Sequence, residues 1–86
     1  MIVHNEYLGW QIEWSQNMQD TLCNLAVRDE ELWDKLREFV HEKFKNVDTF
    51  HTDGVTFLWA FESKDAAREC EKEMKKRVCA WVTAYC

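Results

Sequence analysis

Apolar and polar residues alternate along residues 7–14, which is the pattern of a strand with one buried face. Apolar side chains occupy every second position of this stretch: Leu8, Trp10, Ile12 and Trp14. Successive side chains of a strand point to opposite faces of the sheet. We therefore predict a strand from Tyr7 to Trp14 with its two tryptophans in the core.

The segment from Thr21 to Val27 is ambiguous, because its residues could also begin a helical turn. If the segment is a strand, one face carries Thr21, Cys23, Leu25 and Val27, and the other carries Leu22, Asn24 and Ala26. This alternation favours a second strand, joined to the first by the polar loop 15–20, whose length is usual for such a connection. Residues 1–5 are too few to assign and form either a frayed end or an edge strand.

A first stretch with the 3.6-residue period of a helix follows Asp29, a residue type that favours the N-cap position. Its apolar stripe is as wide as a core-facing helix face and consists of Leu32, Trp33, Leu36, Phe39, Val40 and Phe44. The opposite side is acidic, carrying Glu31, Asp34, Glu38 and Glu42, and it is diluted by Lys35, Arg37 and His41.

A second helical stretch is predicted from Lys64 to Tyr85, with Ser63 as its N-cap. Its apolar stripe comprises Ala67, Cys70, Met74, Val78, Trp81, Val82 and Tyr85. Such a helix is about 33 Å long at 1.5 Å per residue, whereas strands of this protein should reach only about 20–23 Å. We therefore expect its end, Val78 to Tyr85, to overhang the sheet and to need cover from the N-terminal residues or another chain.

Two β-rich runs, 47–52 and 55–61, flank Asp53-Gly54, a dipeptide typical of tight hairpins. A two-residue loop pairs Thr52 with Val55, Phe50 with Phe57 and Asp48 with Trp59. This aromatic-rich face is assigned to the core, which leaves the open face to Val47, Thr49, His51, Thr56, Leu58 and Ala60. The second run is apolar on both faces, as in a central strand.

These elements predict one α+β domain over residues 1–86, in the order β-β-α-β-β-α. The unit from Thr21 to Leu32 is similar in pattern to the unit from Thr56 to Ala67. The natural packing is a two-layer sandwich, with a four-stranded antiparallel sheet and two helices on one face. This connectivity is that of a ferredoxin-like domain whose last strand has been moved to the front.

The composition is globular, with 47% hydrophobic and 31% charged residues and a net charge of −5. This charge disfavours binding to a nucleic-acid backbone, which needs a surplus of Lys and Arg. No apolar run is long enough for a membrane span and no signal-peptide pattern occurs, so we expect a cytoplasmic protein. Reduced thiols are therefore expected at all four cysteines: Cys23, Cys70, Cys79 and Cys86.

Candidate chemistry is sparse. No pair of His or Cys residues has the tight spacing of a zinc site, so neither a metal nor a cofactor is expected. His51 beside Asp53 or Glu13 is the one acid–base pair worth considering, and a surface histidine beside a turn is its simpler interpretation. The charges of the second helix are interpreted as pairs within it, such as Glu71–Lys75 and Glu73–Arg77. No enzyme activity is expected.

Protein binding remains as the favoured function. The overhanging helix end supplies candidate partner-binding residues, Val78, Trp81, Val82 and Tyr85, for a homodimer or another protein. The acidic side of the first helix supplies Glu31, Asp34, Glu38 and Glu42 for a basic partner. We expect a small acidic regulatory protein, in size and charge similar to the inhibitors that phages and mobile elements direct at host factors. The alternative is an RNA- or nucleotide-binding module that uses the open sheet face, with Tyr7 as the aromatic platform.

Overall fold

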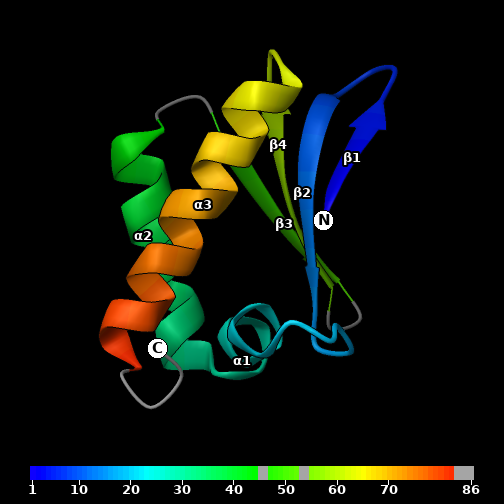
Figure 1. Cartoon of the computed structure of the whole chain (residues 1–86). Helices are drawn as coiled ribbons and strands as arrows, with labels where there is room; N and C mark the ends of the chain where they lie inside the picture. Colours follow the sequence, from blue (N-terminus) through cyan, green and yellow to red (C-terminus); the bar gives the residue numbers. More distant parts are fainter. Residues whose placement is uncertain (45–46, 53–54, 83–86) are drawn as a thin grey trace.

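The protein has an α+β fold with a four-stranded antiparallel sheet and three helices. The computed structural model describes residues 1–44, 47–52 and 55–82. The elements run in the order β1 (Ile2–Asn5), β2 (Gly9–Ser15), α1 (Thr21–Arg28), α2 (Glu30–Lys43), β3 (Asp48–Thr52), β4 (Val55–Phe61) and α3 (Lys64–Trp81). Figure 1 shows α2 and α3 side by side, with the sheet on one side of them and α1 crossing below.

The sheet order is β1-β2-β4-β3, so β2 and β4 form its centre. The central position predicted for residues 55–61 is confirmed. The predicted hairpin register is also confirmed, with Thr52 opposite Val55, Phe50 opposite Phe57 and Asp48 opposite Trp59. The Asp53-Gly54 turn itself lies outside the described residues.

The predicted strand at residues 21–27 is wrong, because this segment forms helix α1. Asp20 caps the helix: its Oδ1 accepts hydrogen bonds from the N–H groups of Leu22 and Cys23 at 3.1 and 3.2 Å. The buried residues Cys23, Ala26 and Val27 follow helical spacing, and this burial outweighs the weak alternation. The strand that forms a hairpin with β2 is instead β1, at the edge of the sheet. The observed order is therefore β-β-α-α-β-β-α.

The predicted core face of the β3–β4 hairpin also needs correction. Thr56 and Leu58, which were assigned to the open face, are fully buried, and Val47 is 5% exposed. The reason lies in the neighbouring strand, since Leu58 pairs with Ile12 and Thr56 with Trp14, and both β2 residues are fully buried. The pairing with β2 thus decides which face of β4 enters the core. The number of aromatic residues on the opposite face does not decide it.

An irregularity in the pairing of β2 with β4 brings Phe61 of β4 into the core. The pairing shifts between Trp10 and Ile12, whose partners Phe61 and Leu58 are three residues apart. Ala60 has a φ of 83°, and this left-handed conformation accommodates the extra residue of a β-bulge. Gly9 lies beside the bulge with a φ of 85°, and a Cβ there would stand 3.0 Å from the carbonyl oxygen of Phe61.

The predicted caps of the two long helices are confirmed. Asp29 accepts the N–H of Leu32 at the start of α2, and Ser63 accepts the N–H of Ala66 at the start of α3. Helix α3 ends at Trp81, before the predicted end at Tyr85. Four members of its apolar stripe have no exposed surface: Ala67, Cys70, Met74 and Val78. Both α1 and α2 contact α3, so the cover for Val78 comes from within the chain.

The cysteines fall into two groups. Cys23 and Cys70 are buried free thiols, and burial raises the pKa of each to about 12. Cys79 is disulfide-bonded, which corrects the expectation of a reduced thiol at this position. Cys86 lies outside the described residues. Among the helices of the described chain, none has the length and apolar character to cross a membrane.

Candidate functional site

Helices α2 and α3 meet through a stack of charged and aromatic side chains. The Arg77 guanidinium of α3 lies over the Phe39 ring of α2, 4.7 Å from its centroid. On the same ring, the Lys43 Nζ approaches to 5.7 Å from the centroid, and it forms an ion pair of 3.0 Å with Glu73. This hydrogen bond from Lys43 holds the pKa of the Glu73 carboxyl below its usual range. The contact fixes the positions of α2 and α3 relative to each other.

A groove runs along this contact on the outer side of the two helices. It consists of two adjoining hollows of about 360 and 450 Å³, which share Phe39, Glu42 and Arg77. We define the α2–α3 groove by the residues that line it: Lys35, Glu38, Phe39, Glu42, Lys43, Arg77 and Trp81. Phe39 and Trp81 are half-buried and pack against the core with the remainder of their surface. The groove therefore presents two aromatic rings, restricted by their contacts with the core, between charged side chains.

The groove joins residues that the sequence placed on two separate candidate surfaces. Trp81 comes from the predicted helix end, whereas Glu38 and Glu42 come from the predicted acidic side of the other helix, and the structure brings all three together. Val82 is half-buried and caps the end of α3. Val78 is a core residue with no exposed surface. Tyr85 lies outside the described residues.

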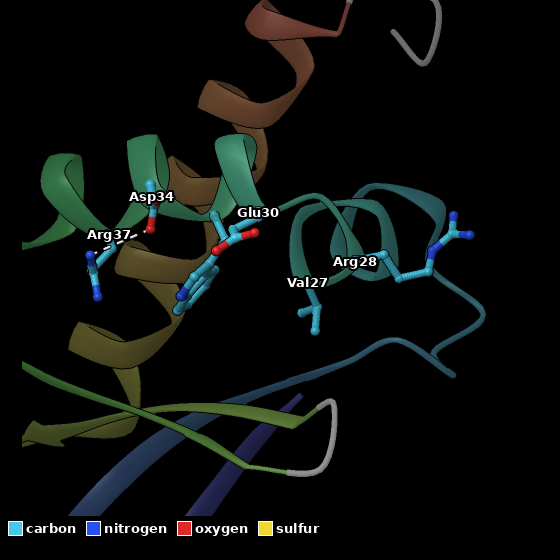
Figure 2. A pocket seen from close by; sticks show the side chains of 6 residues that line it. Val27, Arg28, Glu30, Asp34 and Arg37 are labelled. Atoms are coloured by element: carbon cyan, nitrogen blue, oxygen red, sulfur yellow. Dashed lines mark hydrogen bonds and ion pairs between the residues drawn. The ribbon is translucent and has the colours of Figure 1, made fainter.

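The two remaining acidic candidates lie nearer the start of α2. Glu31 is exposed in the first turn, and Asp34 lines a separate hollow of about 380 Å³ in the corner between α1 and α2. Figure 2 shows that Arg28 extends away from this hollow, while Arg37 forms an ion pair of 3.4 Å with Asp34. Since these charged groups do not converge on one point, the corner offers little to orient a ligand.

Four residues of the groove were missed as site residues: Lys35, Phe39, Lys43 and Arg77. The sequence had placed Phe39 in the core and paired Arg77 with Glu73, whereas Glu73 pairs with Lys43 and Lys76. A signal was present, because Arg77 and Trp81 are four residues apart and so share one face of the helix. The contact between Arg77 and Phe39 cannot be predicted from spacing along one helix, because it depends on how α2 and α3 pack against each other.

The pair Glu71–Lys75 is likewise replaced by contacts between distant segments. Glu71 Oε2 accepts hydrogen bonds from the Trp14 indole at 3.0 Å and from the Met1 amino group at 2.9 Å. The Lys75 ammonium forms an ion pair of 3.1 Å with Asp20. These charges of α3 therefore hold the helix to the sheet and to the start of α1.

The open sheet face does not have the composition predicted for the nucleic-acid alternative. Thr56 and Leu58, two of its expected members, are buried. Tyr7, the expected platform, is 92% exposed but lies in the β1–β2 turn, where the Asn5 side chain accepts the N–H groups of Tyr7 and Leu8. An exposed side chain on a turn is not the rigid strand platform that base stacking uses.

The three histidines lie on three different elements, β1, α2 and β3. His4 packs against the Trp10 ring with 4.7 Å between centroids, and His41 is exposed on α2. The predicted acid–base pair of His51 and Asp53 cannot be placed, because Asp53 lies outside the described residues. Over the same residues, no group of three His, Cys, Asp or Glu side chains is arranged to hold a metal ion.

Comparison with known proteins gives no further guidance. No protein-family model matches the chain, and neither a curated protein nor a solved structure matches it.

Proposed function

We propose that this protein is a small, non-enzymatic binding or regulatory protein that recognises another protein through the α2–α3 groove. The observation that carries the proposal is the groove itself, in which the half-buried rings of Phe39 and Trp81 stand between charged side chains. Aromatic residues surrounded by polar side chains are typical of the centre of protein interfaces.

The packing of the groove supports this use. Phe39 and Trp81 already contact the core, so their rings are ordered before a partner arrives. The Arg77 guanidinium and the Lys43 ammonium approach the Phe39 ring and restrict it further. Binding then loses little side-chain entropy, which is a main cost of forming an interface.

We also propose a specific topology for the fold. The sheet order β1-β2-β4-β3 supports a ferredoxin-like domain with its last strand moved to the front, to which α1 is an addition. A two-layer arrangement of this kind leaves the outer side of α2 and α3 available for binding. An inhibitor of a host or cellular factor, of the kind made by phages and mobile elements, is one form of this function, and the cytoplasm is its expected compartment.

A photo-cross-linking experiment tests the proposal. The amino acid p-benzoylphenylalanine is introduced at position 38, in the groove, and in a control at position 69, an exposed site on α3. The protein is irradiated in cells of the organism that carries the gene, and adducts are identified by mass spectrometry. We expect an adduct with a specific protein, this chain included, from position 38 alone.

Two results would count against protein binding at the groove. Equal adducts from both positions would indicate non-specific contact, and the absence of any adduct at position 38 would leave the groove without a partner. An adduct that nuclease removes would instead support the RNA-binding alternative.

A further inference from the structure

The unpaired charged groups that border the groove are balanced, although the chain has a net charge of −5. Lys35 and Arg77 are positive, whereas Glu38 and Glu42 are negative. Lys43, the other charged residue of the groove, is already paired with Glu73. A purely basic partner would be met by two positive side chains here, so charge complementarity argues against it.

These four side chains also lack ion-pair partners within residues 1–44, 47–52 and 55–82. The ion pairs of α2 and α3 in that part of the chain engage Asp34, Arg37, Lys43, Glu71, Glu73, Lys75 and Lys76. The groove thus carries two positive and two negative groups whose charges are not matched locally. A surface that matches them must itself carry both signs.

The order of the charges along α2 shows which surface has this property. Lys35, Phe39 and Glu42 are four and three residues apart, so they lie on one face of the helix with the ring between two opposite charges. When two copies of α2 approach antiparallel about a two-fold axis, the N-terminal end of each helix lies against the C-terminal end of the other. Opposite charges at the two ends then meet in both places.

One register matches the opposite charges at both ends, although it places the two Glu38 side chains near each other beside the axis. With the axis between Glu38 and Phe39, Lys35 of each copy faces Glu42 of the other. A shift that places the two Phe39 rings directly opposite each other would bring Lys35 against Lys43, which is repulsive. A parallel approach would bring Lys35 against Lys35 and Glu42 against Glu42, which is also repulsive.

We propose, resting on the proposed function, that the occupant of the α2–α3 groove is a second copy of this chain, docked with the two α2 helices antiparallel and with reciprocal Lys35–Glu42 ion pairs. The Phe39 and Trp81 rings form the apolar centre of the dimer. The groove charges cancel once Lys43 is paired, so they add no net repulsion when two chains of net charge −5 meet there.

Sedimentation equilibrium of the purified protein, from about 1 µM to 1 mM at low salt, tests the proposal through charge reversal. K35E and E42K each place like charges opposite each other twice in the dimer, and we expect each to weaken association about tenfold or more. The double variant K35E/E42K restores opposite charges and should dimerise as the unmodified chain does. An equimolar mixture of K35E and E42K should form a heterodimer, because both contacts then join opposite charges.

Matched controls are R68E and E69K, which make the same changes of charge at exposed positions of α3 outside the groove. They should leave the dimer dissociation constant within about twofold, and circular dichroism should show all five variants folded. Dimerisation that ignores K35E and E42K, or a mixture that does not associate, would overturn the proposal. A chain that stays monomeric to 1 mM would overturn it too, yet a cross-link from position 38 to a different protein would leave the proposed function standing.

Discussion

Trp14 donates its indole N–H to Glu71 Oε2 at 3.0 Å, and this bond joins the fully buried ring of the central strand β2 to helix α3. The indole can only donate, so a buried tryptophan needs an acceptor. The Glu71 side chain is 17% exposed and stands at the boundary between core and solvent. The contact holds α3 in register above the sheet, and the register of α3 in turn places Arg77 and Trp81 in the groove.

We therefore expect Glu71→Ala to reduce the free energy of unfolding by about 1–3 kcal/mol, because it leaves a buried donor unsatisfied. Glu71→Gln keeps an acceptor oxygen and should cost less. Urea denaturation measures both. Glu69→Ala, an exposed neighbour on α3, serves as the control and should change stability by less than about 0.5 kcal/mol. Equal effects of Glu71→Ala and Glu69→Ala would show that the Trp14 contact does not stabilise the fold.

The ion pair between Asp20 and Lys75 predicts a dependence of stability on pH. Burial raises the pKa of the Asp20 carboxyl, but hydrogen bonds from Lys75 and from the Cys23 N–H outweigh it, so the net pKa is lowered. A lowered pKa in the folded state contributes stability above the unfolded value near 3.8, and this stability is lost as the pH falls through the folded value. The pKa of Lys75 is raised in spite of its burial by the bond to Asp20, so its contribution is lost only above about pH 10.5.

The variant Asp20→Asn isolates this pair, because asparagine caps a helix as well as aspartate does. It should lower stability by about 0.5 kcal/mol between pH 5 and 9, the modest value of a partly exposed pair, and by less below pH 4. Asp20→Ala also removes the cap and should cost about 1 kcal/mol more at every pH. Thermal unfolding from pH 2 to 9 measures these differences. A constant gap between wild type and Asp20→Asn across that range would contradict the assignment.

Ala60 stores backbone strain at the bulge of β4. A φ of 83° is unfavourable for any residue with a Cβ, so Ala60→Gly should stabilise the protein by about 1 kcal/mol. The matched change Ala66→Gly in α3 should destabilise it, because glycine lowers helix propensity. Gly9→Ala should also destabilise, since its Cβ would crowd the Phe61 carbonyl. Denaturant unfolding of the three variants gives the comparison, and a destabilising Ala60→Gly would refute the strained conformation.

Cys23 and Cys70 should be unreactive in the folded protein. Burial is the main cause that raises the pKa of each thiol to about 12, so the reactive thiolate is scarce at neutral pH. Alkylation with iodoacetamide at pH 7.5, followed by peptide mapping, should label Cys23 and Cys70 only when urea is present. Labelling of either residue within minutes without urea would show that the core opens more easily than its packing indicates.

The sequence predicted those parts of the fold that depend on local signals. The caps Asp29 and Ser63, the stripe of α2 and the register beside Asp53-Gly54 each rest on a few neighbouring residues, and the structure has them as expected. The strand prediction for residues 21–27 is wrong because it rests on alternation over seven residues, and the Asp20 cap that starts the helix does not enter it. The buried spacing of Cys23, Ala26 and Val27 shows the helix only once the core is known.

The face of β4 was missed for a related reason. Which side enters the core depends on its pairing with β2, and the sequence does not reveal that pairing, because residues 9–15 and 55–61 are far apart in the chain. The candidate site shows the same limit. Trp81, Glu38 and Glu42 were found from composition and helix faces, but their meeting in one groove follows from the packing of α2 against α3.

The most direct test of the central claim, that two copies meet at the α2–α3 groove, is a series of ¹H–¹⁵N correlation spectra recorded on dilution from about 1 mM to 20 µM. Dimerisation through the groove should give concentration-dependent shifts centred on residues 35–42 of α2 and 77–81 of α3, with Tyr7 and Leu8 unchanged. Shifts centred on the exposed Tyr7–Leu8 turn, or spectra that do not change with concentration, would contradict it.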